Sequence, residues 1–235
     1  MIGREWRLSE EKQRKKRLRN KMAHLKRLAS PKNWIIPKKG TKYVLRAYPG
    51  KEMSMPLGML VRDLLKLTSI RKETRSFLKK KEIMVDGKAI EEEKFPVGLF
   101  DTIALKNLGK FYRIIINEHG KFDVQEIKEN EIDQKSYKVM GKTSLKNGKM
   151  QLNLFNGRNI ISDKKVSVND SLVVDLQKNS ILKHLPLKDG AKIYVLGGKH
   201  MGSFGTIEKI VERDAKVKIG KESFEIPLDK IYVIG

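Results

Sequence analysis

The last part of the chain, residues 188–235, consists of short segments in which apolar and polar residues alternate. The segments are AKIYVL, GTIEKIV, AKVKI, SFEIPL and KIYVI, and glycine-containing turns separate several of them. Alternation with a period of two is typical of strands with one buried face, and closely spaced short strands are typical of small barrels. We therefore expect a small β-barrel here.

The region before it, residues 107–187, also has mainly strand-like patterns. FYRIIIN and KFDVQEI flank a turn near Gly120, and KTSL and MQLNLF flank a second turn at residues 146–149. We expect the polar stretch KENEIDQKSY between them to form one helix. This region is predicted to be a central, mainly β domain.

Residues 51–106 have helical spacing instead. In PLGMLVRDLLKL, apolar residues recur at the i, i+3, i+4, i+7 positions of one helix face, and Pro56 suits a first helical turn. A second helix is predicted to start near Ser69. Its inward-facing residues would be Ile70, Thr74, Phe77 and Leu78. EIMVDGKAI then predicts a hairpin with an Asp-Gly turn.

Together these patterns predict an α+β multidomain protein. A basic N-terminal arm would occupy residues 1–50, a small α/β domain residues 51–106, the central β-rich domain residues 107–187 and the barrel residues 188–235.

The charge of the chain is unevenly distributed. The formal net charge is +23, and residues 1–46 hold sixteen Lys or Arg against three Glu, a balance of +13. Such an excess is costly in self-repulsion unless a polyanion neutralises it. The segment from Glu10 to Lys21 has Leu18 as its only apolar residue, whereas a membrane-surface helix needs a wide apolar face. A basic arm that orders on nucleic acid fits better than a membrane helix, and a solvated helix is the alternative.

Nothing in the sequence indicates a membrane span, a secretory signal or a disulfide. The chain has no cysteine, no apolar run of membrane-spanning length and no apolar N-terminal core. We expect a cytoplasmic protein.

Motifs for catalysis are also lacking. SYKVMGKT departs from a P-loop because Ser136 replaces the first glycine and a hairpin, rather than a helix, follows. The four histidines show no metal-binding spacing, and Asp101 has no second catalytic group near it in sequence. We interpret the run Glu91 to Glu93 as solvated surface, and we expect no enzyme activity, no cofactor and no metal.

The segment IRKETRSFLKKKEIMVDGK resembles the S-four-type RNA-binding domain. The matching residues are Arg71, Glu73, Arg75, Leu78, Ile83, Val85, Asp86 and Gly87. Thr74 replaces the usual alanine. Lys81 replaces a glycine at the end of the second helix, where a left-handed conformation disfavours lysine.

A wider resemblance covers about residues 23–235. HLKRLASPKNW, FPVGLFDTIAL, FNGRNI, VNDSLVVDL and IYVIG occur in an order similar to the S-four-e family of archaeal and eukaryotic small-subunit ribosomal proteins. KDGAKIYVLGGKHMGSFGTIEKI resembles that family's KOW motif, within an SH3-like barrel. The chain ends at IYVIG without the tail of eukaryotic members, which implies an archaeal source.

The resemblance implies a structural constituent of the small ribosomal subunit that supports translation. Its partners would be small-subunit ribosomal RNA and neighbouring ribosomal proteins, with no membrane and no small-molecule substrate. Two alternatives remain: an accessory chain of an RNA-modifying enzyme, and a KOW-type transcription-elongation factor. Both would need a further domain that the patterns of this sequence do not indicate.

RNA contacts are expected mainly with phosphates and RNA shape. Arg71 and Arg75 lie one helical turn apart and would face one phosphate track. The glycines of GGKHMGSFG would let a loop turn tightly and approach a phosphodiester backbone, or simply form a tight turn. The aromatic residues of the arm would either stack on bases or anchor it. The residues expected to contact RNA are Lys21, His24, Lys26, Arg27, Lys32, Trp34, Lys38, Lys39, Arg62, Arg71, Lys72, Arg75, Lys79, Lys80, Lys88, Lys199 and His200.

Overall fold

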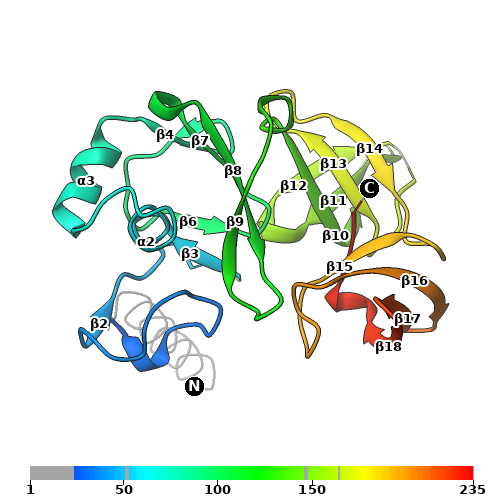
Figure 1. Ribbon diagram of the computed structural model, residues 1–235. Helices are drawn as coiled ribbons and strands as arrows, with labels where there is room; N and C mark the ends of the chain where they lie inside the picture. Colours follow the sequence, from blue (N-terminus) through cyan, green and yellow to red (C-terminus); the bar gives the residue numbers. More distant parts are fainter. Residues whose placement is uncertain (1–23, 51–52, 146–147, 164, 235) are drawn as a thin grey trace, which may run out of the picture.

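The computed structural model describes residues 24–50, 53–145, 148–163 and 165–234, and it is mostly β-structure with few helices. Figure 1 shows residues 24–50 and the helices α2 and α3 on one side of the molecule and the last two sheets on the other. A five-stranded sheet that ends in β8 and β9 lies between them. The expected combination of a few helices with extensive β-structure is therefore confirmed.

The first part of the chain contains two short strand pairs and the helices. β1 pairs with β2, and β3 pairs with β6, both antiparallel. The elements are β1 (Leu25–Lys26), η1 (Arg27–Ala29), β2 (Tyr43–Val44), β3 (Ser54–Pro56), α2 (Leu57–Met59), η2 (Leu60–Leu64), α3 (Arg71–Lys79) and β6 (Pro96–Gly98).

The first predicted helix is confirmed in position but not in regularity. α2 begins after Pro56 and continues into η2, a π-helical turn in which Leu65 N donates to Leu60 O at 2.9 Å. The extra residue in this turn shifts the helix face. Leu57, Leu60 and Val61 are fully buried, whereas Leu64 is only half-buried.

The second predicted helix is α3, and its inward face is partly as expected. Thr74 and Leu78 are buried and Phe77 is half-buried against the core. The expectation for Ile70 is wrong, because its side chain is 54% exposed. Ile70 precedes the helix in an extended conformation, where the Glu73 side chain accepts its backbone N–H at 3.3 Å. Lys81 adopts a φ of +58°, so the position takes the left-handed conformation even without glycine.

The hairpin at Asp86 and Gly87 is confirmed and belongs to the antiparallel sheet β5-β4-β7-β8-β9. Both turn residues have positive φ, 49° and 77°, as a tight hairpin of this kind requires. The strands are β4 (Ile83–Val85), β5 (Lys88–Ala89), β7 (Thr102–Leu105), β8 (Lys110–Ile116) and β9 (Phe122–Glu126), with the turn η3 (Lys106–Leu108) before β8.

The central region forms the antiparallel sheet β12-β11-β10-β13-β14. The predicted helix in KENEIDQKSY is wrong: only the single turn η4 (Glu129–Glu131) forms, and the residues from Gln134 enter β10, where Lys135 and Tyr137 are buried. The remaining bounds are β10 (Gln134–Ser144), β11 (Met150–Leu154), η6 (Phe155–Gly157), β12 (Asn159–Ser162), β13 (Ser171–Asp175) and β14 (Ile181–Leu185).

The C-terminal region forms the antiparallel sheet β18-β17-β16-β15-β19. The expected alternation is confirmed in β17, where Ala215 and Val217 are buried and Lys216 and Lys218 are exposed. The elements are β15 (Lys192–Val195), β16 (Phe204–Val211), β17 (Asp214–Ile219), β18 (Glu222–Pro227), η7 (Leu228–Lys230) and β19 (Ile231–Val233).

Three apolar cores hold these regions, and the largest crosses between them. Trp34 from the N-terminal segment and Tyr194 and Tyr232 from the C-terminal sheet belong to the same core as the helices and the first sheet. The central and C-terminal sheets each have a further core of their own. The C-terminal sheet is therefore packed against the first part of the fold, through Phe100 before β7 and Ile116 of β8.

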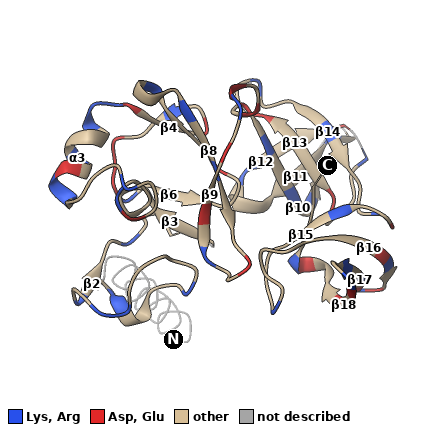
Figure 2. Cartoon of the chain, in the orientation of Figure 1, with Lys and Arg blue, Asp and Glu red and all other residues tan. Residues whose placement is uncertain are grey.

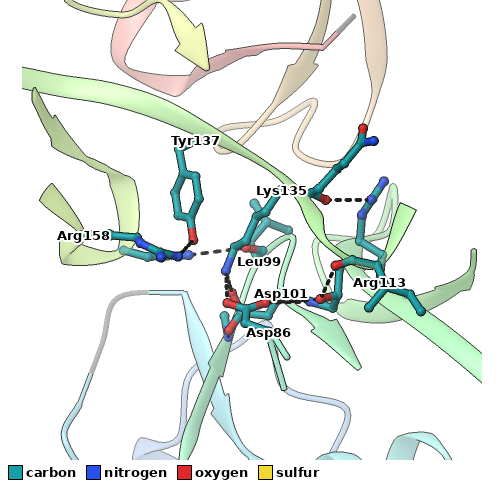
Figure 3. Close-up of polar contacts among 12 residues, drawn as sticks. Asp86, Leu99, Asp101, Arg113, Lys135, Tyr137 and Arg158 are labelled. Atoms are coloured by element: carbon teal, nitrogen blue, oxygen red, sulfur yellow. Dashed lines mark hydrogen bonds and ion pairs between the residues drawn. The ribbon is translucent and has the colours of Figure 1, made fainter. Parts of the chain in front are cut away.

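Buried polar contacts of β10 join the regions further. Lys138 donates from Nζ to the carbonyl oxygens of Leu228, Asp229 and Ile231 at 2.7–2.9 Å. Figure 3 shows Lys135 of the same strand reaching Asp86 and Asp101 of the first sheet. β10 thus anchors both neighbouring regions.

Candidate nucleic-acid interface

A groove of about 1090 Å³ separates the N-terminal segment from the helices. One wall comes from residues 24–48, and the other from α2, η2, α3 and the loop before β6. Six Lys or Arg line the groove, against three acidic residues. The cations are Arg27, Arg46, Arg62, Lys66, Arg71 and Lys94.

Glu93 organises the arginines on α3. Its carboxylate accepts from Arg71 Nε at 2.9 Å and from Arg75 Nη2 at 2.8 Å, and Arg71 Nη2 makes a further short contact. The hydrogen bonds from Arg71, opposed by burial and helped by Arg75, lower the pKa of Glu93 to about 2. The carboxylate is thus charged at neutral pH and fixes both guanidinium groups.

This arrangement corrects two expectations. Glu93 is not solvated surface, because only 7% of it is exposed. Arg71 and Arg75 do lie on the outer side of α3, with side chains 52% and 56% exposed, but they also neutralise a buried carboxylate. Arginine has five N–H donors, so each guanidinium keeps donors for an anion on its exposed side.

Arg27 and Arg62 also make contacts within the protein. Arg27 donates to Pro37 O, Thr41 O and Thr41 Oγ1, each at 2.8 Å, and thereby holds the loop between β1 and β2. Arg62 pairs with its neighbour Asp63 at 2.7 Å. Both side chains still line the groove, and of its acidic residues Asp63 and Glu93 are paired.

The expectation that Trp34 contacts RNA is wrong. Its ring is 5% exposed, and its indole N–H donates to Ser54 O at 2.9 Å. Asn33 O also accepts from Phe122 N at 2.8 Å, which ties the segment to β9. Of the two roles open to the aromatic residues, Trp34 therefore has the anchoring one.

Two tyrosines remain on the groove. Tyr43 is 47% and Tyr48 55% exposed, and both line the groove beside His24. The Lys42 ammonium lies 5.5 Å from the centre of the Tyr43 ring. The groove therefore combines cations with exposed aromatic faces, a combination that proteins use to bind unpaired nucleotides.

The remaining expected residues are more dispersed. Among those the structure describes, the exposed ones outside the groove are Lys26, Lys32, Lys38, Lys39, Lys72, Lys79, Lys80, Lys88 and Lys199. Lys21 lies outside the described residues. Figure 2 shows that Lys and Arg occur in all parts of the drawn fold, so the excess of positive charge is not confined to the N-terminus.

Several groove residues were not predicted from the sequence. Arg46, Lys66 and Lys94 line it, although their sequence positions carry no motif. Lys94 follows three glutamates, which concealed its role. Lys66 has a φ of +54° and sits at the end of the η2 turn, which the helix pattern does not indicate.

The glycine loop at residues 197–205 is built for contacts inside the protein. Gly202 has a φ of +86°, and a Cβ there would lie 2.2 Å from Asn117 O in the β8–β9 turn. A Cβ at Gly205 would lie 2.7 Å from Lys218 O. For these two glycines the close approach is to protein backbone, which agrees with the tight turn that was the alternative to a phosphodiester contact.

Lys199 is nevertheless exposed in this loop, whereas the His200 ring packs against Phe224 at a centroid distance of 3.9 Å. Both lie on the C-terminal sheet and not at the groove.

Asp101, the acid considered for catalysis, is held in an ion cluster. It lies beside Lys135 (Figure 3) and accepts from Gly98 N at 2.8 Å. Burial opposes the charge of Lys135, but attraction by Asp101 and Asp86 outweighs it and raises the pKa of Lys135. Within the described ranges, no group of three or more His, Asp or Glu is placed to hold a metal ion, and no helix is long and apolar enough to span a membrane.

Comparison with known proteins places these features in context. A model described as Ribosomal family S4e matches residues 108–181, and the RS4NT (NUC023) domain matches residues 20–50. Small ribosomal subunit protein eS4 of Archaeoglobus fulgidus is 37% identical over 220 residues, which cover 90% of this chain and 93% of that protein. The same protein of Nanoarchaeum equitans is 33% identical, with coverages of 90% and 94%.

A solved structure agrees with the sequence comparison. The crystal structure of the 30S ribosomal protein S4e from Thermoplasma acidophilum superposes with a TM-score of 0.69 at 30% sequence identity. The match covers 79% of this chain and 96% of that one.

Proposed function

The chain belongs to ribosomal family S4e, and from this premise we propose that it is a structural constituent of the small ribosomal subunit. In this role it binds ribosomal RNA, contacts neighbouring ribosomal proteins and supports translation, in the cytoplasm. The names of the relatives support the assignment to the small ribosomal subunit. The observation in this chain that carries RNA binding is the groove, where cations outnumber acids and two of the three acids are already paired.

Recognition by such a surface depends mainly on phosphates. Guanidinium groups bind phosphate oxygens in a bidentate manner, and Arg71 and Arg75 present their free donors from one fixed platform. The exposed lysines of α3, Lys72, Lys79 and Lys80, extend the same positively charged region. An unpaired nucleotide in the groove would in addition stack on Tyr43 or Tyr48.

The finer architecture is part of the proposal. Residues 1–50 form a basic arm that is anchored through Trp34, residues 51–106 an S-four-like RNA-binding domain and residues 107–187 a central β-rich domain. Residues 188–235 form an SH3-like KOW barrel, and its own apolar core supports that assignment. In this role the chain is a structural component and not an enzyme, and the commitment of Asp101 to a buried ion cluster is in line with that.

Two experiments test the proposal. The native protein should co-sediment with small subunits in a sucrose gradient. Purified protein should bind small-subunit ribosomal RNA with an affinity that falls as salt rises. In a plot of the logarithm of the binding constant against the logarithm of the salt concentration, each phosphate contact should add roughly 0.7–0.9 to the magnitude of the slope. Sedimentation apart from subunits would refute the assignment, and a flat salt dependence would refute phosphate recognition. Co-sedimentation with polymerase or with modified RNA would favour the elongation factor or the modification enzyme.

A further inference from the structure

A second groove lies on the outer face of the C-terminal sheet, away from the one described above. It measures about 570 Å³ and is lined by residues of β15, β16 and the end of β17. Phe204, the first residue of β16, lies in it and is 64% exposed. Gly202, two residues before it, lies close against Asn117 and so fixes the loop that leads into Phe204.

Phe204 is the uncovered end of an aromatic row. On β15, Tyr194 pairs with Tyr232 of β19 on one side and with Phe204 of β16 on the other, so the three side chains share one face. Tyr194 and Tyr232 are each 1% exposed, because Phe100 packs on both at centroid distances of 5.6 and 4.7 Å. Phe204 contacts Tyr194 at 5.1 Å but leaves its outer surface open.

A row of cations runs beside the aromatic row. Thr206 pairs with Lys192 on one side and with Lys218 on the other, which places the two ammonium groups on the same face at either side of the groove. With strands about 4.8 Å apart, their Cα atoms lie about 10 Å apart. Both lysines are exposed, and of the eight described lining residues these two are the only charged ones. Glu208 of β16 accepts a hydrogen bond from the Ser223 hydroxyl and does not line the groove.

Two of the lining residues are glycines. Gly205 and Gly220 contribute no side chains, and a Cβ at Gly220 would meet nothing within 4 Å. A planar group can therefore lie against the Phe204 ring without meeting a neighbouring side chain of this loop.

We propose that this groove receives one unstacked base of the RNA, which stacks on Phe204 while its flanking phosphates bind Lys192 and Lys218. The proposal rests on the RNA-binding function proposed above and adds a base-binding site to it. Grooves of about 300–1,000 Å³ accommodate ligands of nucleotide size. An exposed aromatic face beside cations is the arrangement by which proteins bind single-stranded RNA without sequence preference.

A protein partner is the other class of occupant, and the charges disfavour it. If a protein partner placed an apolar side chain on Phe204, the partner's uncharged backbone would lie near Lys192 and Lys218. Neither the groove nor that backbone would neutralise these two lysines. A phosphate on each side of a base neutralises both. The chemistry of the lining therefore favours the nucleotide.

The test uses the full chain and a single-stranded RNA oligonucleotide of mixed sequence that carries 4-thiouridine. Irradiation followed by mass spectrometry should identify a cross-link in the peptide that contains Phe204, and Ile161→Ala, at an exposed position of β12 outside both grooves, should leave this cross-link unchanged. Phe204→Leu should abolish it and weaken binding of the oligonucleotide about five-fold or more. Phe204→Trp should retain binding, because it keeps the aromatic face, and Lys192→Gln with Lys218→Gln should reduce the log–log salt slope by about 2.

The outcomes separate the two proposals. If the wild-type chain binds no RNA, the proposed function fails and this inference fails with it. If it binds RNA but forms no cross-link at Phe204, and Phe204→Leu binds as tightly as wild type, the base site is refuted while the proposed function stands. Since Phe204 is exposed, Phe204→Leu should melt within a few degrees of wild type, so a binding loss reports the site and not unfolding.

Discussion

The Nζ atom of Lys135 lies 2.6 Å from Oδ2 of Asp86, although 49 positions separate the two residues in the sequence. Asp86 is the turn residue of the hairpin after α3, and Lys135 belongs to β10 of the central sheet. The Lys135 side chain is 3% exposed and also contacts Asp101. The hairpin that resembles an RNA-binding motif is thus fixed to the central sheet by a buried ion cluster.

Lys135→Met should destabilise the protein strongly, because it leaves two carboxylates close together with no cation. Removing one partner of a buried ion pair typically costs about 3–5 kcal/mol in the free energy of unfolding. Urea denaturation measures it. As a control, Lys142→Met on the same strand removes an exposed lysine with one hydrogen bond, to Val166 O at 3.1 Å, and should cost about 1 kcal/mol or less. Equal losses in the two variants would contradict the importance of the cluster.

Gly202→Ala should destabilise the fold, because the new Cβ would overlap Asn117 O at 2.2 Å and the φ of +86° is strained for alanine. We expect a loss of about 2 kcal/mol or more. Gly197→Ala in the same loop is the matched control: its Cβ would make an ordinary contact with Lys230 at 3.7 Å, without a positive φ. Thermal melts compare them, and a Gly202→Ala melt equal to the Gly197→Ala melt would refute the tight packing of the loop on the β8–β9 turn.

Trp34→Ala should destabilise the isolated protein by about 3–5 kcal/mol, since it removes a large buried ring and leaves Ser54 O without its indole donor. The sequence leaves open whether the aromatic residues of the basic segment stack on bases or anchor the segment to the fold. Tyr48→Ala, at an exposed position of the same segment, should cost far less. A Trp34→Ala protein with a wild-type midpoint in urea would contradict the anchoring role of Trp34.

The local patterns of the sequence predicted most elements but not how they meet. The Asp86-Gly87 turn, the apolar face of α3 and the alternation in β17 are each determined within a few residues, so the sequence indicates them directly. The failures have a common physical cause. KENEIDQKSY is polar enough for an exposed helix, but Lys135 is buried only because Asp86 and Asp101 neutralise it from another sheet.

The candidate site shows the same limit. The arginines of α3 could be identified from their spacing, whereas their partner Glu93 lies 22 residues from Arg71 in a run of acids that resembles ordinary surface. Likewise, the four glycines of the C-terminal loop suggested either a close approach to a phosphodiester backbone or simply a tight turn. Only the position of Asn117 shows that Gly202 is required by packing.

The stability of the protein should depend on Glu93 at acidic pH. The folded carboxyl has a pKa of about 2, against an ordinary value of 4.5, so between these values the unfolded chain binds the proton and the folded chain does not. The contribution of Glu93 is therefore fully present above about pH 4.5 and is lost as the pH falls toward 2. Urea midpoints should be measured at about pH 5 and about pH 3. The drop in midpoint between these two pH values should be smaller for Glu93→Gln than for wild type or Glu92→Gln. An identical acid-induced drop in all three would contradict the assignment.

The two functions of Arg71 and Arg75 can be separated by a third substitution. If these arginines only bound RNA from an exposed face, replacing both by Ala would change stability by no more than about 0.5 kcal/mol each. Because they neutralise Glu93, which is 7% exposed, the double variant should instead lose about 2 kcal/mol or more. Adding Glu93→Gln should restore much of this loss, since a neutral amide needs no cation. RNA binding should behave differently: the log–log salt slope should fall by about 2 in the double variant and stay low in the triple variant.

Lys79→Ala with Lys80→Ala, two exposed residues at the end of the same helix, provides the control for a loss of binding without a loss of stability. A triple variant that is stable and binds ribosomal RNA with the wild-type slope would show that Arg71 and Arg75 serve Glu93 alone, and the RNA surface would then lie on the tyrosines and the remaining cations of the groove.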